Sequence, residues 1–163
     1  MPTIATSTPE AFEAFRQAFE SQGLRAALAE LLAHTEYRFL GLWRFQDGRA
    51  AAAIHVDRED PDSLRTAEVP DTATYCSFVR EQQRPFATVD AGADARLADH
   101  PARDTVRSYC GVPIMTSEGE VLGTLCHYDL VPRDFDQINL ELMLMVSSFI
   151  ARDGRMPGYP EAL

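Results

Sequence analysis

The sequence predicts an α+β domain in which helices cover one face of a mainly antiparallel sheet of about five or six strands. Apolar residues recur at helical spacing near both ends of the chain, while the segments between them have strand composition and turn residues. Two β-prone runs, residues 108–114 and 121–129, flank the polar, glycine-containing segment 116–119. That pattern is typical of a β-hairpin at the centre of a sheet.

Helices are predicted at the two ends of the chain. The first begins at Thr8 and Pro9, a capping hydroxyl followed by a proline at the first helical position, and it ends before Gly23. A second helix over 24–34 has leucines on one face, and a last helix over 134–152 has apolar residues at the same spacing. These apolar faces indicate that the helices pack against a sheet.

The middle of the chain is predicted to contain, in order, a strand over 37–45, a returning strand over 50–56, a charged loop over 57–66, a helix over 72–82 and a short strand over 85–89. The dipeptide Asp47-Gly48 between the first two strands is a hairpin signal. Residues 90–107 are polar and contain Gly92 and Pro101, so we expect a long excursion with short helical turns. Excursions of that length inside compact domains are often functional.

Charge and composition exclude several function classes. All 15 basic residues are arginines, and with 25 acidic residues the net charge is −10. A chain this acidic repels phosphate backbones and anionic lipids, so we expect no nucleic-acid partner and no membrane association. The absence of lysine excludes Schiff-base and P-loop chemistry. Neither a secretory leader nor a long apolar run is visible, so a cytoplasmic location is expected.

Three cysteines, Cys76, Cys110 and Cys126, are too few for a secreted disulfide framework and are expected to be free thiols. If Met115 pairs with Val121 across the turn, Cys110 lies directly opposite Cys126, with Cβ atoms about 4.5–5.5 Å apart. Two interpretations follow. The favoured one is a pair of small apolar thiols packed in the sheet, and the other is a redox-responsive pair. Cys76 is the third redox candidate.

Candidate ligand-binding residues on the strands are Trp43, Tyr109 and His127. Trp43 is expected to stack on a ligand or to belong to the core. In the register proposed above, Tyr109 lies opposite His127, and a histidine there would sense pH, bind an anion or simply line the sheet. His127 follows Cys126 directly, and adjacent side chains on a strand point to opposite faces, so this pair does not predict a metal site.

Three further ligand-binding candidates lie in the segments between strands. Cys76 is close to a helix N-terminus, which lowers a thiol pKa and raises its nucleophilicity. Asp90 and Asp99 belong to the polar excursion, where they would hold a cationic or hydroxyl-bearing ligand or be solvated loop residues. Neither catalytic residues nor metal ligands are predicted, and the residues specify no cofactor.

Three segments resemble the GAF domain family, a small-ligand sensory module that shares its plan with PAS domains. They are Tyr-Cys-Gly-Val-Pro-Ile at 109–114, Glu-Gly-Glu-Val-Leu-Gly-Thr-Leu at 118–125 and Pro-Arg-Asp-Phe at 132–135. The resemblance implies a ligand pocket between the sheet and residues 57–107, with the first and last helices on the other face, where they often build a dimer. It divides the chain into an N-terminal helix (1–23), a GAF-like domain (24–153) and a flexible tail (154–163).

The resemblance implies a stand-alone bacterial module that senses an unidentified small molecule and acts through homodimerisation or a partner protein, because no segment resembles an output domain. One alternative is a thiol-based redox sensor or an enzyme like the free-methionine-(R)-sulfoxide reductases, which have a cysteine near Cys76. Those enzymes also need cysteine in the excursion, and residues 96–103 contain none. The other alternative is a pure interaction module whose pocket is filled by Trp43 and Tyr109.

Overall fold

A six-stranded antiparallel sheet forms the centre of the molecule, with the strand order β3-β2-β1-β6-β5-β4. The computed structural model describes residues 7–63 and 68–160. The parts of the predicted N-terminal segment, charged loop and tail that fall on 1–6, 64–67 and 161–163 lie outside the described residues. The strands are β1 (Phe39–Gln46), β2 (Arg49–Asp57), β3 (Val69–Pro70), β4 (Phe86–Thr88), β5 (Ser108–Met115) and β6 (Val121–Asp129).

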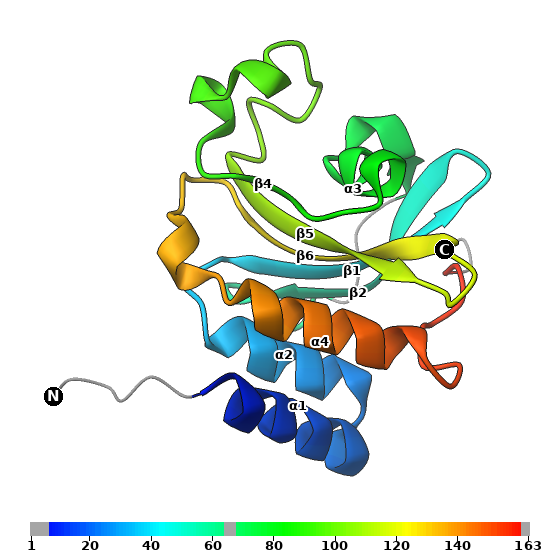
Figure 1. The fold of residues 1–163 in the computed structure, drawn as a ribbon. Helices are drawn as coiled ribbons and strands as arrows, with labels where there is room; N and C mark the ends of the chain where they lie inside the picture. Colours follow the sequence, from blue (N-terminus) through cyan, green and yellow to red (C-terminus); the bar gives the residue numbers. More distant parts are fainter. Residues whose placement is uncertain (1–6, 64–67, 161–163) are drawn as a thin grey trace, which may run out of the picture.

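Three helices cover one face of this sheet (Figure 1). They are α1 (Thr8–Gln22), α2 (Leu24–Ala33) and α4 (Leu140–Ala151). Helices α2 and α4 lie against the strands, and α1 packs outside them as an additional layer (Figure 1). The short helix α3 (Cys76–Gln82) and the excursion that follows β4 lie on the opposite face. The predicted α+β architecture is confirmed.

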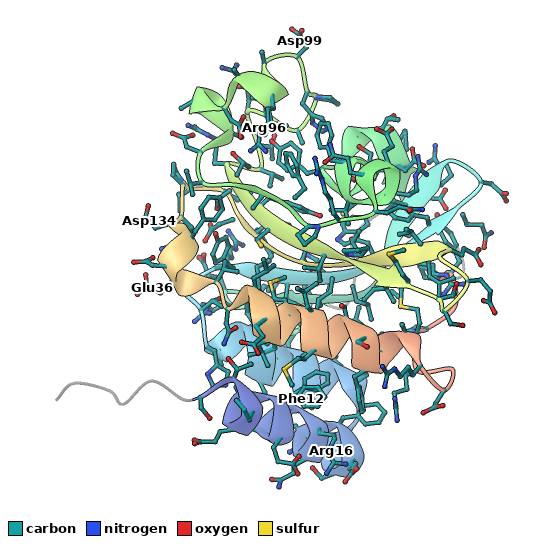
Figure 2. The ribbon with its side chains drawn as sticks, viewed as in Figure 1. Phe12, Arg16, Glu36, Arg96, Asp99 and Asp134 are labelled. Atoms are coloured by element: carbon teal, nitrogen blue, oxygen red, sulfur yellow. The ribbon has the colours of Figure 1, made fainter. Side chains whose placement is uncertain are left out.

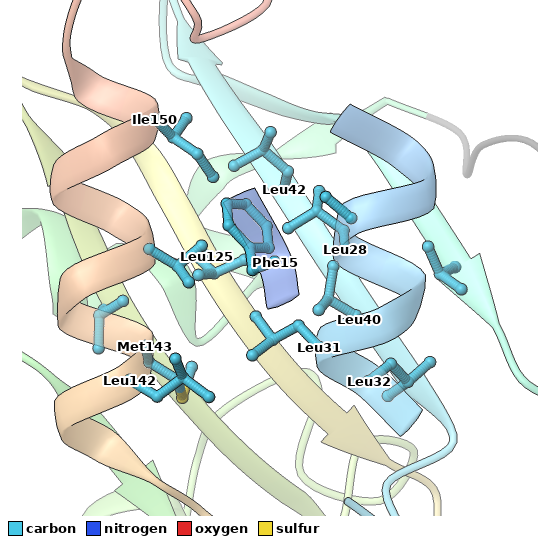
Figure 3. Packing of buried hydrophobic residues seen from close by; sticks show 14 of the residues in the cluster. Phe15, Leu28, Leu31, Leu32, Leu40, Leu42, Leu125, Leu142, Met143 and Ile150 are labelled. Carbon is cyan, nitrogen blue, oxygen red and sulfur yellow. The ribbon is translucent and has the colours of Figure 1, made fainter. Parts of the chain in front are cut away.

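The main core lies between the sheet and the three helices (Figure 3). Leucines from α2 meet Leu40, Leu42 and Leu125 of the central strands, and all three of these strand side chains are fully buried. Phenylalanines join α1 to α4, with the ring centroid of Phe149 5.7 Å from that of Phe15 at a near-perpendicular angle. Because this face is filled by the chain itself, any ligand has to bind on the other face or at the surface.

Three helix starts differ from the prediction. The helix expected over 72–82 begins at Cys76, because residues Asp71–Ala73 form a separate 3₁₀ turn. The last helix begins at Leu140 and not at residue 134, because a 3₁₀ turn (Phe135–Gln137) precedes it and Asn139 caps it, accepting a hydrogen bond from the Leu142 amide at 3.0 Å. The cap of α1 is Ser7, which accepts from the Glu10 amide at 3.3 Å, and not Thr8. The longest helix among the described residues has 15 residues, and none is long and apolar enough to cross a membrane.

The C-terminal segment makes contacts with the sheet. Met156 packs against the main core, and an Arg44 guanidinium nitrogen donates to the Pro157 carbonyl oxygen at 3.4 Å. The Tyr159 hydroxyl donates to the Glu68 carboxylate. The flexibility of 154–163 stays a prediction, as do the three domain boundaries.

Candidate functional site

A cavity of about 180 Å³ lies on the sheet face opposite the main core. It lies between β1, β5 and β6 on one side and residues of the 69–76 and 102–106 segments on the other. We call this space the central cavity. It is lined by Trp43, Val69, Ala73, Thr74, Tyr75, Cys76, Ala102, Val106, Tyr109, Cys126 and Tyr128. The lining is therefore aromatic and aliphatic, with hydroxyl and thiol groups as its polar parts.

Two glycines let aromatic rings lie along the sheet surface. A Cβ atom at Gly41 would be 2.4 Å from the indole nitrogen of Trp43, and a Cβ atom at Gly111 would be 2.2 Å from the Tyr109 hydroxyl oxygen. Each ring thus occupies the space above a neighbouring glycine of its own strand. Tyr75 meets Tyr109 edge-on, with ring centroids 5.5 Å apart. The two glycines of β1 and β5 therefore determine where the Trp43 and Tyr109 rings lie on the floor of the cavity.

Cys76 begins α3, and its sulfur is surrounded by hydrogen-bond donors. The Tyr109 hydroxyl donates to this sulfur at 3.3 Å and the Thr124 hydroxyl at 3.1 Å. Burial alone would raise the pKa of the Cys76 thiol. Hydrogen bonds from Cys126 and from the neighbouring hydroxyls together lower the pKa by more than burial raises it, so the pKa lies below its usual range. Donors that point at a buried sulfur favour its thiolate form.

Cys126 is the second thiol of the cavity. It lies on β6 opposite Gly41 and Gly111, is fully buried, and its sulfur is 3.6 Å from the Gly41 carbonyl oxygen. It is also within hydrogen-bonding reach of the Cys76 sulfur. Burial and the hydrogen bond to Cys76 raise the pKa of Cys126 well above its usual range. One thiol of this pair is therefore disposed to ionise and the other to stay protonated.

Tyr128 connects the cavity to a buried histidine. Its hydroxyl is hydrogen-bonded to the Trp43 side chain and lies 2.5 Å from Nε2 of His55 on β2. His55 is 4% exposed, and burial lowers its pKa. Its Nδ1 has no hydrogen-bond partner among the described residues. This hydrogen bond links a residue of the cavity lining to β2, whose His55 does not line the cavity.

Comparison with known proteins agrees with this architecture. The family model of the GAF domain matches residues 21–153. The chain belongs to the GAF domain family. A cyclic di-GMP phosphodiesterase of Pseudomonas aeruginosa is 33% identical over 73 residues, which are 43% of this chain and 12% of that protein. The chain thus spans a small part of that relative.

Two solved structures show the shared fold. The GAF domain of an Acinetobacter phosphoenolpyruvate-protein phosphotransferase has a TM-score of 0.69 and 13% identity, covering 91% of this chain and 92% of that chain. The free methionine-R-sulfoxide reductase of Neisseria meningitidis, in complex with its substrate, has a TM-score of 0.65 and 16% identity, covering 93% and 90%. At these identities the likeness concerns the fold alone.

The GAF domain brings together three of the six predicted ligand-binding residues. Trp43, Cys76 and Tyr109 line the central cavity. Asp90 does not, because it pairs with Arg107 at 2.8 Å. Asp99 does not either, because it is exposed at the outer end of the excursion and points away from the sheet (Figure 2). A ligand role for either aspartate would have to lie outside the cavity.

The predicted register of the central hairpin is wrong by one residue. Met115 pairs with Val121 as expected, but a bulge follows, and Ile114 then pairs with Gly123. Cys110 therefore lies opposite His127 and Tyr109 opposite Tyr128. Since a shift of one residue reverses the faces of a strand, the predicted Cys110–Cys126 pair does not exist.

His127 and Cys110 consequently face the main core and not the cavity. His127 is 1% exposed and lies beside Tyr37, with ring centroids 5.9 Å apart. Burial lowers the pKa of His127 to about 4, so the ring is neutral at physiological pH and suits neither anion binding nor pH sensing there. The Cys110 sulfur lies 4.0 Å from the Met143 sulfur of α4, and burial raises its pKa to about 12.

Sequence reasoning missed Tyr128, Thr124 and the cavity-facing position of Cys126. All three belong to β6, where alternate residues share a face, so the period-two rule would have grouped them. The pairing of Tyr128 with His55 joins residues 73 positions apart and carries no local sequence signal.

Proposed function

We propose that this GAF domain is a sensory module that binds a small, uncharged, ring-containing molecule in the central cavity. The chemistry of the lining carries the proposal. It contains four aromatic side chains and no arginine, aspartate, glutamate or histidine among the described residues that form it. Ligand sites typically combine an apolar, aromatic lining with a few directed polar groups.

The size and charge of the cavity favour some ligands over others. Its volume of about 180 Å³ is smaller than the roughly 300–1,000 Å³ of sites for drug-sized molecules. An anionic ligand would lose its hydration without gaining a basic partner from the lining. Cyclic nucleotides are therefore disfavoured here, although a partial relative is a cyclic di-GMP phosphodiesterase. A compact neutral alcohol, phenol or ketone fits the lining better.

The first prediction tests whether this cavity takes a ligand. Trp43 is the only tryptophan of the chain, so its fluorescence reports on the cavity directly. We expect titration with cyclohexanol and benzyl alcohol, used as neutral probes, to change this fluorescence. At a hundredfold excess over Kd, binding stabilises the fold by about 2.7 kcal/mol, and we expect Tm to rise by roughly 5–10 °C.

A matched pair of variants controls this experiment. Ala102→Leu places an isobutyl group in the cavity and is expected to abolish both the fluorescence change and the Tm rise, since Ala102 lines the cavity. Ala98→Leu adds the same group at an exposed position of the same excursion and is expected to behave as wild type. If neutral probes bind the Ala102→Leu variant as well as wild type, the cavity is not their site. If no neutral compound binds wild type, the pure interaction module becomes the better interpretation.

We further propose that the output passes through a homodimer formed by α1 and α4. A groove of about 870 Å³ lies on their outer surface, lined by Phe12, Leu140, Glu141, Leu144, Met145, Ser148, Phe149, Arg152, Asp153 and Arg155. Leu140 and Leu144 are each 41% exposed, which is unusual for large apolar side chains on one helix face.

Charge along α4 supports a second copy of the chain as the occupant of this groove. Glu141 lies in the first turn of α4 and Arg152 directly after its last residue, and both side chains are exposed. If two α4 helices pack antiparallel about a twofold axis, each Glu141 lies opposite Arg152 of the second copy. Leu144 then lies near the twofold axis, and Leu140 lies toward each end of the contact.

The second prediction tests this dimer. Leu144→Glu places two carboxylates at the twofold axis, so we expect the dimer dissociation constant to rise at least about tenfold. Val131→Glu is the matched control, because Val131 is 47% exposed and does not line the groove. Light scattering coupled to size-exclusion chromatography over a range of concentrations measures both variants. A monomeric wild-type protein, or equal behaviour of the two variants, would contradict the proposed dimer.

The cytoplasmic location stays a prediction.

A further inference from the structure

Two of the three thiols meet in the central cavity, one from the sheet and one from the segment that lies over it. Cys76 comes from the first turn of α3 and Cys126 from the middle of β6. The Cys76 sulfur accepts a hydrogen bond at 3.1 Å from the hydroxyl of Thr124, which lies two residues before Cys126 on the same face of β6. Both side chains line the cavity. Their 50-residue separation in the sequence means that only the tertiary fold brings them together.

The groups around this pair are suited to thiol chemistry. The Tyr109 and Thr124 hydroxyls donate to the Cys76 sulfur, which stabilises negative charge there before a reaction. Cys126 is placed to attack a modified Cys76, because it already lies beside it. The cavity gives a small reagent a place next to the Cys76 sulfur, although that side chain is only 2% exposed.

We propose that Cys76 and Cys126 form a redox-active dithiol, which a small hydroperoxide entering the central cavity oxidises to a disulfide. The proposal rests on the cavity of the proposed function but not on any resident ligand. It differs from the redox pair expected from the sequence, because Cys110 lies on the other face of the sheet and takes no part.

The reaction has two balanced steps. The Cys76 sulfur attacks one oxygen of ROOH, so that an S–O bond forms, the O–O bond breaks, and the thiol proton leaves with the alkoxide as ROH. The Cys126 sulfur then attacks the resulting sulfenic acid, an S–S bond forms, and hydroxide leaves with the Cys126 proton as water. Two thiols are oxidised by two electrons in total, and the hydroperoxide is reduced. A low-molecular-weight thiol restores the dithiol by exchange.

Disulfide formation would alter the cavity that we assign to the ligand. The covalent bond ties the start of α3 to the centre of the sheet and removes the negative charge of the Cys76 thiolate, so its sulfur becomes a weaker acceptor for the Tyr109 and Thr124 hydroxyls. These hydroxyls would then reorient toward the cavity. The oxidised and reduced forms are therefore expected to bind neutral ligands with different affinity.

The experiment treats the ligand-free, reduced chain with one equivalent of hydrogen peroxide, blocks the remaining thiols with N-ethylmaleimide in a denaturant, so that buried thiols also react, and maps the cysteines by mass spectrometry. Digestion with trypsin and a glutamate-specific protease puts each cysteine on its own peptide, because Arg107, Glu118, Glu120 and Arg133 flank Cys110 and Cys126. We expect a linked Cys76–Cys126 peptide pair and an alkylated Cys110. Peroxide oxidation is expected to slow at least about tenfold in Cys76→Ser and to change less than about twofold in Cys110→Ser.

A second variant keeps the test decisive if the first fails to fold. In Cys126→Ala the sulfenic acid of Cys76 has no partner, so dimedone is expected to label Cys76. The proposal is overturned if oxidised wild type keeps Cys126 alkylated, or if Cys110 carries the cross-link. Neither outcome depends on the neutral probes, so a failure of the dithiol and a failure of the ligand site are seen separately.

Discussion

Replacing Gly123 with alanine is expected to destabilise this GAF domain by about 3 kcal/mol or more, the upper end of the cost of overpacking. A Cβ atom at this position would lie 1.8 Å from the Trp43 carbonyl oxygen. That oxygen belongs to the backbone of β1, so it cannot rotate away as a side chain would. Relief requires the central β1–β6 pair to separate where Arg44 pairs with Gly123. Urea denaturation measures the loss.

Gly158→Ala controls for the general effect of removing a glycine. No heavy atom lies within 4 Å of a Cβ built at Gly158, so its free energy of unfolding is expected to stay within about 0.5 kcal/mol of wild type. If Gly123→Ala is as stable as this control, the close approach of β1 and β6 is absent in solution. The bulged register that depends on it would then need revision.

The helices were the most predictable part of the fold. Pro9 and Gly23 mark the ends of α1, and α2 follows its leucine pattern, so both helices agree with the prediction to within one residue. The last helix was predicted six residues too long at its start, because its apolar pattern continues through Ile138, which is part of the extended step before Asn139. Apolar spacing alone does not distinguish a helix from a 3₁₀ turn that packs on the same side.

The candidate site was predictable only where it depends on local alternation. Because side chains alternate along a strand, the sequence places Trp43 and Leu42 on opposite faces of β1, and the structure has them so. The faces of β5 and β6 relative to each other depend on one extra residue at the bulge beside Leu122, and the polar turn gives no sign of it. The bulge lies beside the close contact of Gly123 with Trp43, a tertiary constraint that one strand's sequence does not contain.

The excursion shows a second reason why the site residues could not all be predicted from the sequence. Asp90 and Asp99 were candidates because acidic residues gathered in a long polar segment, yet the cavity takes its upper lining from the aliphatic Ala102 and Val106 of that segment. Asp90 instead accepts from the Gly92 amide at 3.0 Å and binds Arg107. Polar excursion residues thus fix the loop, while its sparse apolar residues face the site.

We expect the thiols of the native protein to react with an alkylating reagent at very different rates. Cys76 and Cys110 are equally hidden from bulk solvent, 2% and 3% exposed, so exposure alone predicts similar rates. Cys76 lines the central cavity and has a lowered pKa, whereas Cys110 packs on Met143 and its pKa is raised to about 12. Because the thiolate is the reactive form, Cys76 should react with iodoacetamide at least about a hundredfold faster at neutral pH.

Residue-resolved alkylation of the native protein therefore tests most directly whether the sheet separates a filled core from a ligand cavity. The peptides that isolate each cysteine are quantified by mass spectrometry over time, with the denatured chain as the reference for intrinsic reactivity. Rapid labelling of Cys76, with Cys110 labelled only as fast as the protein unfolds, is the predicted result. Labelling of Cys110 at the rate of Cys76 under native conditions would contradict the assignment of these thiols to opposite faces.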